Sequence, residues 1–140
     1  MTFAVTQPLP FGDCDPSGIA YFPAYLNRLS GVVEQFFTHI GIPWSVLIRD
    51  RRIGAPTVKL DLTFERPGFH GDLLTFSIGI AAIGRASLDL HHRITVEDRL
   101  LWTAEQRLVA TSLETHRAIA WPDDIRDALM RQKALRPEGR

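Results

Sequence analysis

Residues 11–23 read Phe-Gly-Asp-Cys-Asp-Pro-Ser-Gly-Ile-Ala-Tyr-Phe-Pro, and this stretch decides how the rest of the chain is organised. It holds two carboxylates, two glycines, two prolines and the only cysteine of the protein. Pro23 fits the first turn of a helix. Apolar residues then recur every three or four positions until Gly41 and Pro43 end the pattern: Phe22, Tyr25, Leu26, Leu29, Val33, Phe36, Phe37 and Ile40. We predict a long core helix preceded by a loop that can aim a side chain.

The segments on either side of this helix predict strands and a second helix. Residues 3–9 alternate loosely before the loop and predict a strand, and residues 43–50 predict a further turn or short helix. Five more strands are predicted at residues 56–65, 74–82, 85–96, 101–110 and 115–120, and a short amphipathic helix at 122–131. The short connectors suit antiparallel hairpins. We therefore expect an α+β domain in which one sheet covers one helix.

Length and composition narrow the class of protein. A chain of 140 residues, 45% of them apolar, predicts a single domain over residues 1–140, with a frayed polar tail at 133–140. Sixteen basic residues balance sixteen acidic ones, which gives no indication of a nucleic-acid or membrane partner. A single cysteine cannot form an intramolecular disulfide, and the first residues lack a basic, apolar leader pattern. We expect a cytoplasmic protein.

The order of elements, with Gly12-Asp-Cys-Asp-Pro-Ser-Gly-Ile19 before the helix, resembles the hot-dog-fold acyl-CoA thioesterases. The resemblance is closest to the 4-hydroxybenzoyl-CoA thioesterase family and covers nearly the whole chain. It includes the segments Tyr21-Phe-Pro-Ala-Tyr25, Pro67-Gly-Phe-His-Gly-Asp72 and Trp121-Pro-Asp-Asp-Ile-Arg126. It implies an antiparallel sheet of about five strands wrapped around one long central helix. It also implies hydrolysis of an aromatic acyl-CoA, such as 4-hydroxybenzoyl-CoA, or of a short-chain acyl-CoA, without a cofactor or metal.

The resemblance also assigns roles to three positions. The family's catalytic loop aspartate matches Asp15, and the backbone N–H that holds the thioester carbonyl oxygen matches Phe22. Basic residues at the turn before a late strand meet the coenzyme A phosphates in that family. In this chain Arg85 stands at that turn, with Gly84 and Ala86 beside it.

Thioester chemistry independently requires these kinds of group. A carboxylate must attack the carbonyl carbon or activate a water molecule, and donors must meet the developing oxyanion. Asp15 supplies the first, and the free N–H groups and positive dipole end of a helix supply the second. The alternative for Asp13 and Asp15 is that they cap the helix or bracket a turn, and Asp13 fits this alternative better.

Other candidate groups fit the sequence less well. Cys14 lies between two carboxylates, which raise the pKa of a thiol, and is better explained as a small packed side chain. Glu34 is the second carboxylate candidate, because other hot-dog thioesterases carry their acid on the central helix, although a solvated glutamate is the simpler interpretation. Ser17 lacks the G-x-S-x-G pattern of serine hydrolases. Among the histidines, His91 and His92 are neighbours on a predicted strand and must face opposite ways.

Two other functions and one assembly state follow as hypotheses. A hot-dog dehydratase or hydratase needs an acidic residue paired with a histidine near the helix, and a non-catalytic acyl-CoA-binding module needs only the fold. A sheet wrapped on one helix leaves open edges, which the resembled family pairs across a two-fold axis. We therefore expect a homo-dimer or homo-tetramer with its site near the subunit interface.

Overall fold

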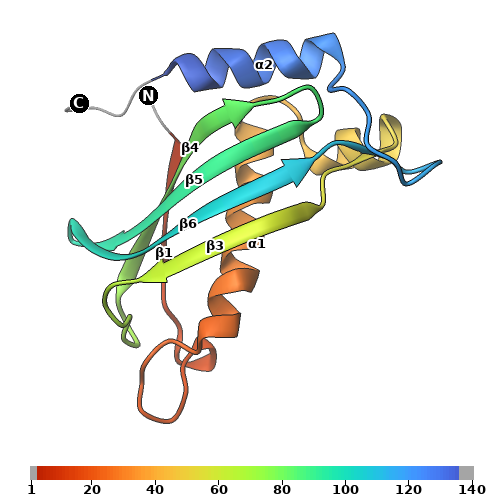
Figure 1. The fold of residues 1–140 in the computed structure, drawn as a ribbon. Helices are drawn as coiled ribbons and strands as arrows, with labels where there is room; N and C mark the ends of the chain where they lie inside the picture. Colours follow the sequence, from red (N-terminus) through yellow and green to blue (C-terminus); the bar gives the residue numbers. More distant parts are fainter. Residues whose placement is uncertain (1–2, 136–140) are drawn as a thin grey trace.

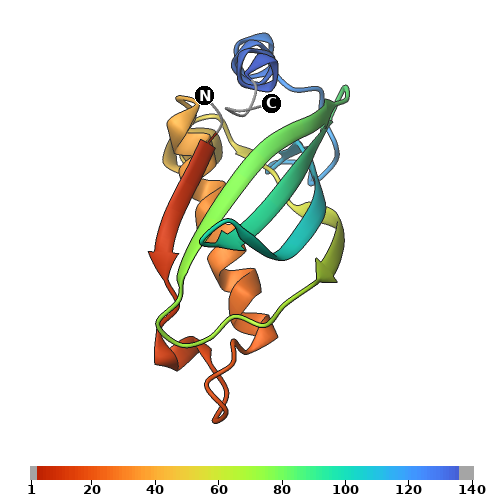
Figure 2. The same cartoon turned by 90° about the vertical axis from the view of Figure 1, so that its left-hand side faces the viewer.

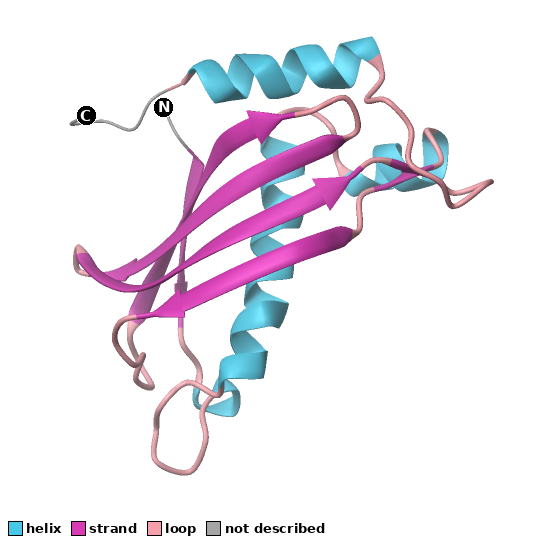
Figure 3. Cartoon of the chain, viewed as in Figure 1, coloured by secondary structure: helices cyan, strands magenta, loops and turns pink. Residues whose placement is uncertain are grey.

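The computed structural model of the protein describes residues 3–135 (Figures 1 and 3). Its elements in chain order are β1 (Phe3–Pro8), the 3-10 turn η1 (Phe11–Asp13), α1 (Phe22–His39), the π-helical turn η2 (Ser45–Asp50), β2 (Ile53–Gly54), β3 (Thr57–Phe64), β4 (Leu73–Ile83), β5 (Ser87–Val96), β6 (Arg99–Val109), β7 (Thr111–Ser112) and α2 (Asp123–Ala134).

The five long strands form one antiparallel sheet in the order β1-β4-β5-β6-β3. The α+β arrangement predicted from the periodicities is confirmed, because α1 packs along one face of this sheet (Figure 2). Side chains of β5 show how the period of two produces this packing. Leu88, Leu90, His92, Ile94 and Val96 are buried, whereas the odd-numbered residues that alternate with them lie toward the opposite face.

The predicted central helix forms within one residue of its expected ends. Its apolar stripe puts six residues into the core: Tyr25, Leu29, Val32, Val33, Phe36 and Phe37. Tyr25 packs on Trp102 of β6, with ring centroids 4.9 Å apart, and Phe36 meets Phe3 of β1 edge-on at 5.6 Å. Aromatic pairs in these geometries add stabilisation beyond the area that they bury.

The predicted strand at residues 115–120 is wrong. The Ser112 hydroxyl accepts the backbone N–H groups of Glu114 and Thr115, at 3.1 and 3.2 Å, and His116 has a φ of 60°. A side chain that bonds to the backbone two and three residues ahead closes a local turn instead of continuing a strand. The short β7 pairs with β2, and Ala118 makes an isolated bridge to Thr111.

Helix α2 packs against β4 at the end of the sheet that carries the β4–β5 turn (Figure 1). It buries Ile125, Ala128 and Leu129. A frayed tail was expected from residue 133, but α2 continues through Ala134, and residues 136–140 lie outside the described part of the chain. No helix in the described range is long and apolar enough to cross a membrane.

Candidate active site

The loop between β1 and α1 is a small hairpin held at its base. Cys14 and Ala20 form an antiparallel bridge, and the Asp15 N–H donates to the Ile19 carbonyl at 2.9 Å. At the tip, the Gly18 N–H donates to the Asp15 carbonyl at 2.9 Å, and Gly18 has a φ of 82°, which favours glycine. The loop also docks on residues 67–72, where the Ala20 N–H donates to the Gly68 carbonyl at 2.8 Å.

The side chain of Asp15 is held by Ser17. Its Oδ1 accepts the Ser17 backbone N–H at 2.8 Å and also the Ser17 hydroxyl. These hydrogen bonds lower the pKa of Asp15 below its usual value, so the carboxylate is ionised at neutral pH. Oδ2 accepts no hydrogen bond from residues 3–135.

These contacts separate the two alternatives for the loop aspartates. Helix α1 has no side-chain cap at its N-terminus, so neither Asp13 nor Asp15 caps it. Asp15 does bracket the turn at Ser17, and this turn fixes the orientation of its carboxylate. Asp13 instead pairs with Arg28 of α1, with 2.7 Å between Oδ2 and Nε. Hydrophobic periodicity does not indicate this ion pair, because the two residues lie in different elements.

One backbone donor is left over at the start of α1. The Tyr21 N–H donates to the Asp13 carbonyl at 2.8 Å, Pro23 has no N–H, and the Ala24 N–H donates to the Tyr21 carbonyl at 2.8 Å. The Phe22 N–H, at the first helical position, has no acceptor within the described part of the chain. Unpaired donors at a helix N-terminus attract negative charge.

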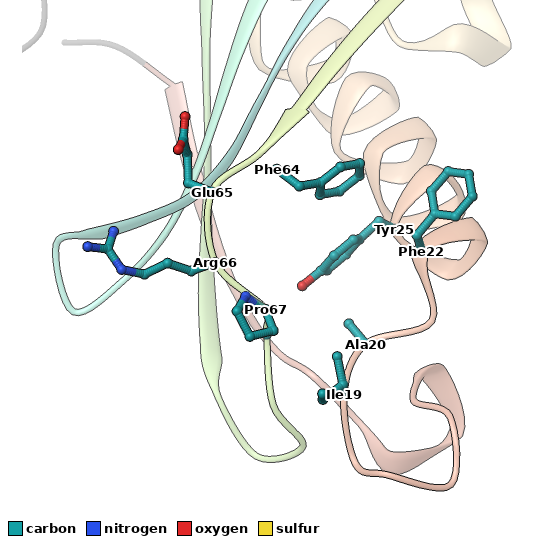
Figure 4. Close-up of a pocket in the computed structure, with 9 residues that line it drawn as sticks. Ile19, Ala20, Phe22, Tyr25, Phe64, Glu65, Arg66 and Pro67 are labelled. Carbon is teal, nitrogen blue, oxygen red and sulfur yellow. The ribbon is translucent and has the colours of Figure 1, made fainter.

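A cavity of about 330 Å³ opens beside Phe22 (Figure 4). It is lined by residues of the loop, α1, the end of β3 and the segment after it: Ile19, Ala20, Phe22, Tyr25, Phe64, Glu65, Arg66, Pro67 and Gly68. The phenyl rings of Phe22 and Phe64 meet edge-on at 6.0 Å between centroids, and both are about half exposed. Figure 4 shows the Tyr25 hydroxyl pointing from α1 toward Ala20 and Pro67, whereas Arg66 points away.

Tyr25 is the buried polar group of this cavity. Burial raises the pKa of Tyr25 to about 12, with a smaller contribution from Asp72, so its hydroxyl stays protonated. The hydroxyl lies against Gly68, where a Cβ would come within 2.3 Å of it. Sequence periodicity placed Tyr25 in the core but did not indicate that its polar end reaches a cavity.

The three residues singled out from the sequence do not gather in one copy of the chain. Phe22 lines the cavity, whereas Asp15 does not. Arg85 follows β4, whose other end pairs with Pro8 next to the loop, so the eleven residues of β4 separate Arg85 from the loop. At ~3.3 Å per residue this is about 36 Å. The Arg85 side chain is exposed and forms no ion pair with residues of the described range.

The alternative nucleophiles and acids have other surroundings. Burial raises the pKa of the Cys14 thiol, and the nearby carboxylates raise it further, so it stays protonated. Glu34 is exposed on α1, away from the cavity beside Phe22. His91 and His92 do face opposite ways: His91 is exposed and contacts Glu105, and His92 is buried against Gln106.

Residues 9–129 match the family described as the thioesterase-like superfamily. The chain belongs to this superfamily. This chain is 31% identical over 96 residues to 4-hydroxybenzoyl-CoA thioesterase from Pseudomonas sp. (strain CBS-3). The matched residues are 67% of this chain and 68% of that protein. The solved structure of 4-hydroxybenzoyl-CoA thioesterase from that strain has a TM-score of 0.83 and 28% identity, and it covers 91% of this chain and 98% of its own.

The names of two further relatives describe hydrolysis of other aromatic acyl-CoA thioesters. A 1,4-dihydroxy-2-naphthoyl-CoA hydrolase from Synechococcus elongatus is 25% identical over 120 residues, which are 85% of this chain and 88% of that protein. The structure of a gentisyl-coenzyme A thioesterase has a TM-score of 0.80 and 26% identity, and it covers 89% of this chain and 98% of its own. The predicted hot-dog fold and the class of enzyme, a thioester hydrolase acting on acyl-CoA, are confirmed. The roles of Asp15, Phe22 and Arg85 stay predictions.

Proposed function

We propose that this thioesterase hydrolyses the coenzyme A thioester of a hydroxylated aromatic acid, with Asp15 as the catalytic carboxylate and the Phe22 N–H as the oxyanion donor. The unpaired Phe22 N–H, next to an apolar cavity and a few residues after an ionised Asp15, is the observation that carries the proposal. The relatives support the acyl group, because their names describe hydroxybenzoyl, dihydroxynaphthoyl and gentisyl thioesters.

The reaction adds water across the C–S bond of the thioester. Asp15 Oδ2 either attacks the carbonyl carbon, giving a mixed anhydride that water then hydrolyses, or removes a proton from the attacking water. In both routes the carbonyl oxygen gains negative charge, which the Phe22 N–H stabilises. The C–S bond then breaks, and coenzyme A leaves as a thiolate that takes up a proton. An ionised Asp15 is required at the start of either route, which its hydrogen bonds to Ser17 favour.

A second copy of the chain completes the site in this proposal. Strand β3 is an edge of the sheet, contains no proline, and exposes the side chains of Val58 and Phe64, at 57% and 46%. Pairing two β3 strands antiparallel across a two-fold axis covers these side chains and satisfies the edge backbone groups. It also sets the Thr57 end of each copy beside Phe64 of the other.

This pairing supplies groups that one copy lacks near Phe22. The Thr57 end carries a cavity of about 270 Å³ lined by Trp44, Leu47, Ile48, Gly54, Ala55 and Pro56. The indole N–H of Trp44 is buried there without an acceptor in the described residues. An apolar cavity with one free donor suits an aromatic ring bearing a hydroxyl group. The β4–β5 turn with Arg85 lies at this same end, because the Ala110 N–H donates to the Ala86 carbonyl and the Val109 N–H to the Pro56 carbonyl.

Release of free thiol from a panel of acyl-CoA thioesters tests the proposal. We expect turnover of 4-hydroxybenzoyl-CoA to exceed that of a straight-chain acyl-CoA, and Asp15→Asn to abolish it while acyl-CoA binding is retained. Glu34→Gln is the matched control and should keep wild-type turnover. An active Asp15→Asn variant, with loss of activity in Glu34→Gln, would assign the acid to α1. Binding without thiol release from any substrate would identify an acyl-CoA-binding module instead.

A further inference from the structure

The side chain of Arg28 joins three separate elements next to the loop. Its Nε donates to Asp13 Oδ2 of η1 at 2.7 Å, and its Nη1 donates to Gln7 Oε1 of β1 at 3.2 Å. Arg28 itself lies on α1, six residues after Phe22. The ion pair is half-buried, with side-chain exposures of 32% for Arg28 and 25% for Asp13. Partial burial strengthens an ion pair relative to one at an open surface.

Asp13 connects this ion pair to both halves of the proposed site. Its carbonyl accepts the N–H of Tyr21, the residue before Phe22, at 2.8 Å. In the other direction Asp13 lies two residues before Asp15, across Cys14, which pairs with Ala20. A displacement of Asp13 therefore moves the start of α1 and the base of the Asp15 hairpin relative to each other.

We propose that the Arg28–Asp13 pair is a positioning device for the reaction, which fixes the distance between the Asp15 carboxylate and the Phe22 N–H. The inference rests on the proposed roles of these two residues. Arg28 suits the task because its planar group donates to Asp13 and Gln7 from fixed directions, which a lysine ammonium does not reproduce. Neither Arg28 nor Asp13 lines the cavity beside Phe22, so the pair acts through other groups.

The ion pair also removes an electrostatic obstacle. Asp13 and Asp15 are two carboxylates separated by one residue, and an uncompensated charge on Asp13 disfavours the ionised form of Asp15. The guanidinium of Arg28 offsets that charge at a distance of 2.7 Å. The ion pair thus holds the position of the loop and compensates the charge of Asp13, while the hydrogen bonds from Ser17 keep Asp15 ionised.

Steady-state kinetics of Arg28→Gln, Asp13→Asn and the double variant test the inference. Because misplacing a catalytic group by about 1 Å can lower turnover about a hundredfold, we expect each single variant to lower kcat about ten- to a hundredfold, with KM changed less than about threefold. The double variant should be no slower than the slower single variant, since both remove one interaction. Arg107→Gln is the matched control: it breaks the pair with Asp89, also 2.7 Å long, on the outer face of the sheet.

Three results would overturn the inference, and they differ from failure of the proposed function. Wild-type kcat in Arg28→Gln, together with an inactive Asp15→Asn, would refute the positioning role alone. A raised KM at unchanged kcat in Arg28→Gln would assign Arg28 to substrate binding. An equal loss of kcat in Arg28→Gln and Arg107→Gln would reduce the effect to general destabilisation. An active Asp15→Asn variant would refute the proposed function and the positioning role together.

Discussion

Replacing His92 should remove a large part of the acid sensitivity of this fold. His92 lies on β5 between the sheet and α1 and is 1% exposed. Its Nε2 contacts Gln106 Oε1 at 2.7 Å, and Gln106 Nε2 donates to the Thr57 hydroxyl at 2.9 Å. Because Gln106 Oε1 can only accept a hydrogen bond, these contacts fix the neutral tautomer of His92 that carries its proton on Nε2. The other ring nitrogen, Nδ1, is buried without a partner in the described residues, so protonation would create an unpaired N–H and a charge in the core.

The sign and size of the effect follow from the pKa of His92. Burial lowers it to about 4, below the value of about 6.5 expected in an unfolded chain. The unfolded chain therefore takes up the proton first. The contribution to stability is complete above about pH 6.5 and is lost as the pH falls toward 4. At about 1.4 kcal/mol per pH unit, lowering the pH from 7.5 to 5 should cost about 2 kcal/mol from this residue.

Urea unfolding of wild type and His92→Gln at pH 7.5 and pH 5.0, at one protein concentration, measures this contribution. Glutamine cannot titrate, and its Nε2 can replace the imidazole Nε2 as donor to Gln106. We expect wild type to lose about 2 kcal/mol more than His92→Gln between the two pH values. His91→Gln, on the exposed face, is the control and should behave as wild type. Equal losses in wild type and His92→Gln would show that His92 is not buried as a neutral group.

Three further changes test the cavity, the oxyanion donor and the phosphate contact. Phe22→Pro removes the backbone N–H at a helix position that tolerates proline, and it should lower kcat about 10²- to 10³-fold relative to Phe22→Ala, which keeps the donor; similar kcat values would exclude this donor. Gly68→Ala places a Cβ within 2.3 Å of the Tyr25 hydroxyl and should destabilise the fold by about 1–3 kcal/mol, with partial rescue by Tyr25→Phe in thermal unfolding. Arg85→Ala should raise KM about tenfold for coenzyme A thioesters, leave kcat unchanged, and have no effect on pantetheine thioesters, which lack the nucleotide phosphates; equal effects on both substrates would refute the phosphate contact.

Local pattern was sufficient to predict most of the fold. The helix from Phe22 and the strands β4 and β5 each bury one face. Apolar residues therefore recur with a period of 3.6 in the helix and of 2 in the strands, and this spacing can be seen in the sequence. The prediction of a strand at 115–120 was wrong because the Ser112 hydroxyl closes a turn there, and the spacing of apolar residues does not reveal a turn of this kind. The order in which the strands pair could not be predicted from local pattern either, because β1 pairs with β4 through residues that lie some seventy positions apart in the chain.

Some residues of the candidate site could likewise be proposed from the sequence, and others could not. Asp15 and Phe22 could be proposed from the sequence because the loop motif and the helix start that carry the family resemblance are continuous in it, and their roles stay predictions. Arg28 was missed because its partners, Asp13 and Gln7, lie in other elements and an arginine on a helix carries no periodic signal. Tyr25 was placed in the core by its spacing, yet only the folded chain shows its hydroxyl against Gly68 at the cavity.

The charges on the sheet favour association through the β3 edge over association through the outer sheet face. That face carries the Arg107–Asp89 pair and the His91–Glu105 contact, both partly exposed. Covering them in a face-to-face contact would remove their hydration without new partners, which is costly. The β3 edge instead offers unpaired backbone groups and the half-exposed side chains of Val58 and Phe64. Because Phe64 lines the cavity beside Phe22, we expect this mode of association to bring the subunit contact next to the proposed site, and a monomer found by sedimentation at micromolar concentration would refute it.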